Sequence, residues 1–109
     1  MSELNSVIQE LKKFRDERDW EQFHNPKDLA IALSIEANEL LECFLWKDSK
    51  DGNLDKIKEE LADVLSYALL LLDKYELDFS SLMADKIAIN KAKYPVNKSK
   101  GTAKKYNEL

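Results

Sequence analysis

Glycine and proline are almost absent from this chain, and their scarcity constrains the fold more than any other feature. The 109 residues include two glycines and two prolines, so long stretches contain no residue that interrupts a helix. In these stretches apolar side chains recur every three or four residues, which is the spacing of one face of an α-helix. No stretch alternates apolar and polar residues as a strand does. The sequence therefore predicts an all-α fold.

Four helices are expected, and most of their ends carry start or stop signals. Asn25 as the cap, followed by Pro26 at the first helical position, is a strong start. Ser80 or Ser81 is expected to cap the last helix, and Pro95 ends it because proline disfavours helix at the residue before it. The expected helices cover roughly residues 2–19, 26–46, 54–75 and 79–94.

The length suits one domain, and its charge is distributed unevenly. Residues 1–85 hold 10 Lys and Arg against 20 Asp and Glu, whereas residues 86–109 hold seven Lys and one Glu. We expect a helical domain at 1–95 with an irregular basic arm, 96–109, that belongs to it. The acidic body argues against nucleic acid as the main partner. A chain this short buries a modest core, so self-association would help it.

No segment of the sequence predicts a membrane span or an export signal. The longest apolar run, residues 68–72, is far too short to cross a bilayer. The first residues lack a basic stretch followed by an apolar one. Cys43 is the only cysteine, so an intrachain disulfide is excluded. These features predict a cytoplasmic protein without a membrane partner.

Two pairs of carboxylates, each spaced three residues apart, lie in the second and third expected helices. They are Glu36 with Glu39, and Glu60 with Asp63. Residues at this spacing project from nearly the same side of a helix, and a short loop predicts that the two helices pack antiparallel. Four converging acids repel one another unless a cation lies between them. The pattern indicates a divalent-metal site suited to phosphate chemistry, with solvated surface acids as the alternative.

The acid pairs and the segments around them resemble the MazG-like, all-α nucleoside triphosphate pyrophosphohydrolases, and among these the dCTP pyrophosphatase branch. The likeness runs through residues 17–24, 26–30, 36–46, 59–67, 86–95 and 104–109. It implies a four-helix-bundle-like fold whose helical hairpins assemble as a dimer or a dimer-of-dimers tetramer. It also implies Mg²⁺-dependent conversion of a nucleoside triphosphate to the monophosphate and pyrophosphate, with dCTP or related deoxynucleotides as substrates and housecleaning of nucleotide pools as the role.

The resemblance also implies roles for individual residues. The catalytic acids and magnesium ligands carried over by position are Glu36, Glu39, Glu60 and Asp63. The positions that contact the base and sugar in the branch are Trp20, His24, Trp46 and Tyr67. The positions that contact the sugar and phosphates are Lys86, Asn90 and Tyr94. Leu11 departs from the pattern, since the branch often has histidine there, and base preference therefore stays open.

Alternatives remain open at this point. Trp20 and Trp46 fit a core as well as a base-binding site, and Lys86 with Asn90 fits an ordinary helix-surface pair. A phosphoribosyl-ATP pyrophosphohydrolase of the same superfamily is one competing function. A non-catalytic helical oligomerisation module, whose acids merely solvate the surface, is another. The number of metal ions and the acid that accepts the proton of the attacking water are also undetermined.

Overall fold

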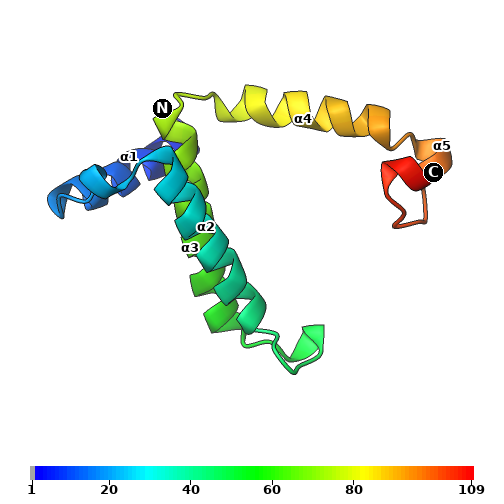
Figure 1. Ribbon diagram of the computed structural model, residues 1–109, viewed down its shortest axis with the longest axis horizontal. Helices are drawn as coiled ribbons and strands as arrows, with labels where there is room; N and C mark the ends of the chain where they lie inside the picture. The colour runs from blue at the N-terminus through cyan, green and yellow to red at the C-terminus, as the bar shows by residue number, and fades with distance from the viewer. Residues whose placement is uncertain (1) are drawn as a thin grey trace. The chain divides into compact units, whose positions relative to one another are not determined.

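The computed structural model describes residues 2–109, and within them it is helical without a strand (Figure 1). The prediction of an all-α fold is confirmed. Among these described residues, no helix combines the length and apolar character that crossing a membrane requires. The chain divides into two compact units, the first ending at Glu76 and the second beginning at Leu77, and each is described by itself. The elements are α1 (Glu3–Glu17), η1 (Glu21–Phe23), α2 (Pro26–Glu42), η2 (Ser49–Asp51), α3 (Leu54–Lys74), α4 (Phe79–Lys93), α5 (Val96–Ser99) and η3 (Tyr106–Glu108).

The first unit is built on a hairpin in which α2 and α3 lie side by side (Figure 1). Both helices begin with an asparagine cap that satisfies a backbone N–H left without an intrahelical partner. The side chain of Asn25 accepts from the backbone N–H of Asp28 at 2.8 Å. The side chain of Asn53 accepts from the backbone N–H of Lys56 at 3.1 Å. These caps fix the first residue of each helix. They thereby determine which residues of α2 and α3 lie on the face toward the other helix.

The loop between α2 and α3 closes tightly over the end of the hairpin. A Cβ atom added at Gly52 would lie 2.9 Å from side-chain atoms of both Phe44 and Ile57. Glycine is therefore required there by close packing. Within residues 2–109 the buried apolar side chains are few, and all lie in this first unit: Ile8, Leu29, Cys43 and Leu70.

α2 ends at Glu42, four residues before the predicted end. The backbone N–H groups of Cys43, Phe44 and Leu45 donate to carbonyls three residues back, so the last turn tightens to 3₁₀ geometry. Trp46 then adopts a left-handed conformation with φ of 62°, which ends the helical path.

The second unit contains α4 and the segment that follows it. The predicted cap at Ser80 or Ser81 is wrong, because Asp78 caps α4 and its carboxylate accepts from the backbone N–H of Ser81 at 2.9 Å. The segment after Pro95, expected to be irregular, contains α5 and η3. There the ring of Tyr106 contacts that of Tyr94, with the ring centroids 6.3 Å apart.

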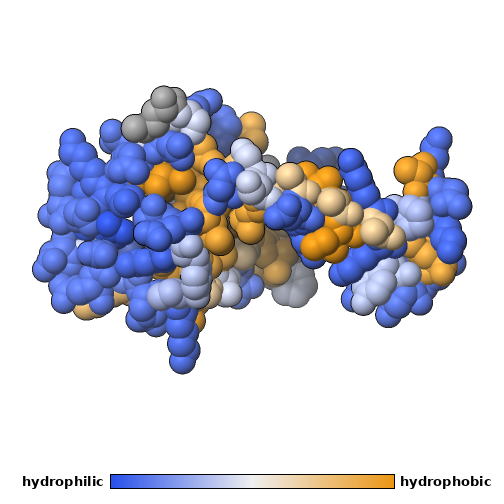
Figure 2. Space-filling model, turned by 90° about the horizontal axis from the view of Figure 1, so that it is seen from above, coloured by the Kyte–Doolittle hydropathy of each residue, from blue (hydrophilic) through white to orange (hydrophobic). Residues whose placement is uncertain are grey.

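Apolar side chains remain exposed on both units (Figure 2). Every residue of α4 is exposed in the single chain. The large apolar side chains that α4 exposes are Phe79, Leu82, Met83, Ile87 and Ile89. Apolar surface of this extent on one helix is typical of a surface that other helices cover.

Candidate metal centre

Carboxylates from both helices meet on the α2–α3 hairpin. Glu36 on α2 and Glu60 with Asp63 on α3 each place one carboxylate oxygen within 4.8 Å of the others. Glu39, one turn after Glu36, lines a pocket together with Glu60. The three-residue spacing on two antiparallel helices produces this convergence, since each pair faces the opposite helix. The structure thus brings the four predicted acids into one region.

The electrostatics of this cluster are unfavourable without a cation. Oε2 of Glu36 and Oε2 of Glu60 are buried and have no hydrogen-bond partner within residues 2–109. Burial, helped by the carboxylates of Glu39, Asp63 and Glu60, raises the pKa of Glu36 to about 7. Several carboxylate oxygens with unused lone pairs are the ligands that hard divalent cations prefer. The residues present therefore fit a divalent metal.

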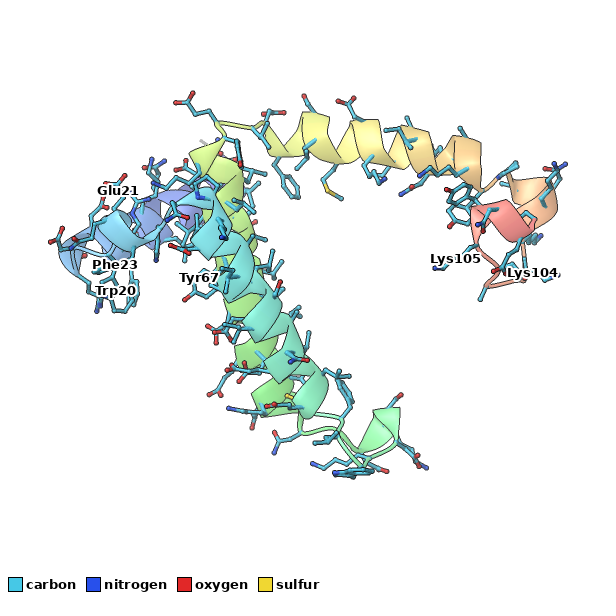
Figure 3. The ribbon with its side chains drawn as sticks, in the orientation of Figure 1. Trp20, Glu21, Phe23, Tyr67, Lys104 and Lys105 are labelled. Atoms are coloured by element: carbon cyan, nitrogen blue, oxygen red, sulfur yellow. The ribbon has the colours of Figure 1, made fainter. Side chains whose placement is uncertain are left out.

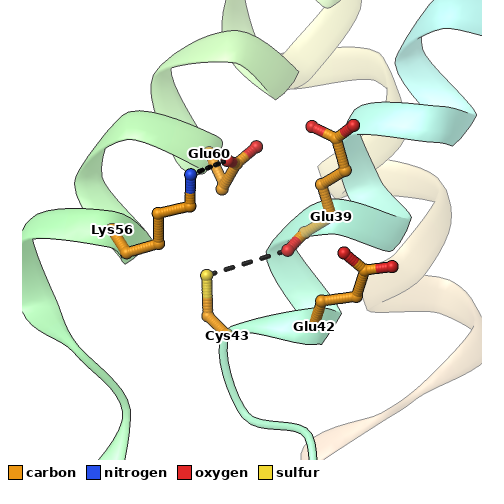
Figure 4. A pocket seen from close by; sticks show the side chains of 5 residues that line it. All are labelled: Glu39, Glu42, Cys43, Lys56 and Glu60. Atoms are coloured by element: carbon orange, nitrogen blue, oxygen red, sulfur yellow. Dashed lines mark hydrogen bonds and ion pairs between the residues drawn. The ribbon is translucent and has the colours of Figure 1, made fainter.

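Beside the cluster lies a pocket of about 350 Å³ that carries a lysine (Figure 4). Nζ of Lys56 lies 3.1 Å from Oε1 of Glu60 and 3.7 Å from Oε2 of Glu59. The Lys56 ammonium lowers the pKa of Glu60, which keeps that buried carboxylate charged. The residues that line the pocket are Glu39, Glu42, Cys43, Lys56 and Glu60. Lys56 was not predicted, although its position four residues before Glu60 is a helical pairing signal.

A second pocket, of about 240 Å³, is lined by rings and lies on the Asp63 side of the cluster. The rings of His24 and Tyr67 meet edge to face, with centroids 6.3 Å apart. Trp20 belongs to the same lining, and Figure 3 shows it at the connection between α1 and α2. The full lining is Leu11, Phe14, Arg15, Trp20, His24, Asp63, Ser66, Tyr67 and Leu70.

His24 is held as a neutral imidazole in this pocket. Burial, together with the positive charges of Arg15 and Lys74, lowers its pKa. Its Nδ1 is buried and has no hydrogen-bond partner within the described part of the chain. Burial and the nearby acids, Glu36 first among them, raise the pKa of Tyr67, so its hydroxyl stays protonated. The pocket thus offers neutral polar groups among aromatic surfaces.

The remaining predicted contacts lie outside both pocket linings. Trp46, four residues after the end of α2, is 95% exposed. Lys86, Asn90 and Tyr94 are exposed residues at the spacing of successive turns of α4, in the second unit. Arg15 was missed by the sequence-based prediction. Its signal was a charge at an apolar position of the first helix, since Ile8, Leu11 and Arg15 follow one another at three and four residues.

Comparison with known proteins gives the family. A family model described as MazG-like matches residues 31–109. The chain is 40% identical over 105 residues to dCTP pyrophosphatase 1 of Mus musculus and 38% identical to that of Homo sapiens. Each match covers 89% of this chain and 62% of the relative, so the chain spans less than two thirds of the length of these curated relatives.

A solved structure agrees with the sequence relatives. It is the crystal structure of a pyrophosphatase from Archaeoglobus fulgidus, which is 37% identical to this chain with a TM-score of 0.80. The match covers 87% of this chain and 94% of that one. An all-helical chain whose acids converge on one hairpin is thus matched in both sequence and backbone. The chain belongs to the MazG-like family.

Proposed function

We propose that this chain is a Mg²⁺-dependent nucleoside triphosphate pyrophosphohydrolase that converts dCTP or a related deoxynucleotide to the monophosphate and pyrophosphate. One observation carries the proposal. The acid cluster lies between a polar pocket that contains Lys56 and a ring-lined pocket that contains Trp20 and Tyr67. A nucleoside triphosphate has the same order of groups, with its α-phosphate between an anionic chain and a flat base.

The proposal assigns the metal to the acid cluster. The ligands would be Glu36, Glu39, Glu60 and Asp63, and the two unpaired oxygens of Glu36 and Glu60 support this assignment. A magnesium ion held there would offset the negative charge of both the acids and the triphosphate and would polarise the α-phosphate. Without that charge an acidic site repels a polyphosphate.

The reaction itself is a substitution at the α-phosphorus. The oxygen of a water molecule forms a bond to phosphorus, the bond to the bridging oxygen of pyrophosphate breaks, and a carboxylate of the acid cluster accepts the proton that the water gives up. The ammonium of Lys56 lies in the polar pocket at the edge of the cluster, where it is paired with Glu60 at 3.1 Å. A lysine so placed would stabilise the charge that accumulates on the departing pyrophosphate.

The nucleoside would occupy the ring-lined pocket. Trp20 and Tyr67 offer aromatic surfaces there, and stacking of a base on such a ring is worth about 1–3 kcal/mol. His24 contributes a neutral imidazole with an unused nitrogen. Trp46 is proposed as a further base contact, because an indole 95% exposed has no role in the core.

The names of the relatives support the reaction class. Two of them are dCTP pyrophosphatases, and the matched solved structure is described as a pyrophosphatase. We extend the family resemblance to Lys86, Asn90 and Tyr94 as sugar and phosphate contacts, to a homodimer or homotetramer, and to a cytoplasmic housecleaning role. The exposed apolar side chains of α4 favour the assembly.

A substrate panel tests the proposed function. The purified chain is incubated with Mg²⁺ and, separately, dCTP, dTTP, dUTP, dATP, dGTP, ATP, phosphoribosyl-ATP and inorganic pyrophosphate. The expected products are a nucleoside monophosphate and pyrophosphate, separated by ion-exchange chromatography. Release of neither product from any nucleotide would remove the proposal. Turnover of phosphoribosyl-ATP alone would favour the competing superfamily activity.

Thermal unfolding separates an enzyme from a non-catalytic module. An ion that binds only the folded protein adds about 2.7 kcal/mol of stability at a hundred times its dissociation constant. A Mg²⁺ titration should therefore raise the melting temperature of the wild type. The Glu36→Gln variant should show a smaller rise, because it loses one ligand charge. Equal curves for both proteins at every Mg²⁺ concentration would contradict the assigned ligands.

A further inference from the structure

Arg15 is a buried cation whose hydrogen-bonding capacity is largely unused. It is 6% exposed, although arginine is seldom buried without a partner. Within residues 2–109, its side chain makes one hydrogen bond, from Nε to Oδ1 of Asp16 at 2.8 Å. A guanidinium carries five N–H donors, so the four on its two Nη atoms have no protein acceptor in that range. Within residues 2–109, neither Nη atom is among the buried side-chain atoms that lack a partner, so water or a ligand in the adjoining pocket can reach these donors.

The position of Arg15 restricts what that ligand is. Arg15 lines the ring-lined pocket together with Trp20, His24 and Tyr67. Several aromatic side chains in one lining favour a ligand with a flat ring, which can stack on them, over a tetrahedral anion, which cannot. Asp63 belongs to both this lining and the acid cluster, so the phosphates of a bound nucleotide would lie on that side. Within the described chain Arg15 forms no ion pair with the acid cluster; its ion pair is with Asp16.

We propose that Arg15 selects cytosine by donating from its guanidinium to O2 and N3 of the base. This inference rests on the proposed function and names the residue that sets its base preference. O2 and N3 of cytosine are adjacent acceptors in one plane, and the planar fork of arginine matches such a pair. Leu11 lies one helical turn before Arg15 in the same lining and offers no polar group. Arg15 is the cationic side chain of that lining.

The same geometry discriminates against the other pyrimidines. Thymine and uracil carry a hydrogen on N3, so the guanidinium would face a donor where cytosine offers an acceptor. The guanidinium then loses one hydrogen bond, and one of its N–H donors faces the N3–H donor of the base, an arrangement that binding sites penalise strongly. Guanine also presents two adjacent acceptors, O6 and N7, to an arginine fork, so dGTP belongs in the test.

The test compares kcat/KM for dCTP with kcat/KM for dTTP, dUTP and dGTP. Wild type is expected to prefer dCTP, and in Arg15→Met the ratio of dCTP to dTTP should fall about tenfold or more. The matched control is Arg18→Met, which removes the same charge from the end of the same helix. Arg18 is exposed and donates to the carbonyl of Phe14, so this variant should keep the wild-type ratio.

Arg15→Lys is a second test variant, used in case Arg15→Met fails to fold. It keeps the charge and most of the stem but lacks the planar fork, so its ratio of dCTP to dTTP should also fall. An unchanged ratio in either folded variant, or a wild type that prefers dTTP, dUTP or dGTP, would overturn the role of Arg15 and leave the hydrolase proposal intact. A wild type that cleaves no nucleoside triphosphate would instead overturn the proposed function itself.

Discussion

Glu36 is the residue whose surroundings most strongly affect the site. It is partly buried, it faces three other carboxylates, and one of its oxygens has no partner within residues 2–109. Its raised pKa means that ionisation is unfavourable in the folded chain when no cation is present. The same property that weakens the metal-free fold would favour binding of a divalent ion.

Substitution Glu36→Gln tests both consequences. We expect kcat/KM for the preferred nucleotide to fall on the order of a hundredfold or more, because even indirect supporters of metal ligands cost 10–100-fold. The folded pKa of Glu36, about 7, exceeds its ordinary value of 4.5. Its contribution to stability is therefore complete below pH 4.5 and is lost as pH rises through 7.

Melting temperatures measured in EDTA check the sign of this effect. The variant and the wild type should melt together near pH 4, and the variant should melt higher at pH 8. Equal melting temperatures at both pH values would contradict the raised pKa of Glu36. The circular dichroism spectrum, which should be nearly unchanged, controls for misfolding.

Trp46 combines backbone strain with exposure. Its φ of 62° is costly for a residue other than glycine, and its indole is 95% exposed. In Trp46→Gly we expect the free energy of unfolding to stay unchanged or rise by up to about 1 kcal/mol, because glycine relieves the strain. We expect kcat/KM to fall, since one stacked ring is worth about 1–3 kcal/mol.

The control for Trp46 is Glu76→Gly, at a second exposed position with positive φ, 52°. It should change stability in the same direction as Trp46→Gly and leave kcat/KM unchanged. Both quantities come from urea unfolding and steady-state assays. A loss of stability of several kcal/mol in Trp46→Gly would show that the indole packs in the folded protein after all.

At the scale of helices, the sequence predicts the parts that depend on local spacing. The α2–α3 hairpin and the convergence of Glu36, Glu60 and Asp63 follow from three-residue spacing, two asparagine caps and one short loop. The early end of α2 was not predictable from local spacing, because the apolar pattern continues to Phe44 although the backbone bonds of residues 43–45 shift to three-residue spacing. Helical spacing places Arg15 on the apolar face of α1, but its burial also depends on how α1 packs against α3, which spacing alone does not give.

The start of α4 gives a second reason for error. Asp78, Ser80 and Ser81 are all good caps, and spacing alone does not choose among them. The structure selects Asp78, whose carboxylate reaches the backbone N–H three residues later. The sequence therefore predicts the position of α4 correctly but not the residue that caps it.

The cap of α2 supports a prediction at the same scale. Asn25→Ala removes the bond to the backbone N–H of Asp28 and should lower the free energy of unfolding by about 1 kcal/mol. Asn38→Ala, at an exposed position inside α2, should leave it unchanged or raise it slightly, because alanine is the better helix former. Urea titrations of both variants measure the difference, and equal effects would count against the cap.

At the scale of the whole molecule, the chain buries little of its apolar surface by itself. In the described part of the chain four apolar side chains are buried, whereas α4 alone exposes five large ones. A small chain with so thin a core gains stability by covering that surface with another copy. Sedimentation velocity should accordingly give a mass that is two or four times the 12.6 kDa of one chain.

Leu82→Glu should shift that mass toward the single chain, since it places a charge among the exposed apolar residues of α4. Ser80→Glu adds the same charge one turn or less away, at a polar position, and should keep the wild-type mass. A wild type that sediments as one chain at every concentration would exclude self-association through α4.

The four acids all come from two helices joined by a single loop, and this has a kinetic consequence. The ion would bridge neighbours that the hairpin already holds together, so its arrival need not organise distant parts of the chain. Loading should slow hydrogen–deuterium exchange at the amides around residues 36–39 and 60–63 while barely altering exchange beyond Leu77. Magnesium binding would then slow the local opening of this one hairpin.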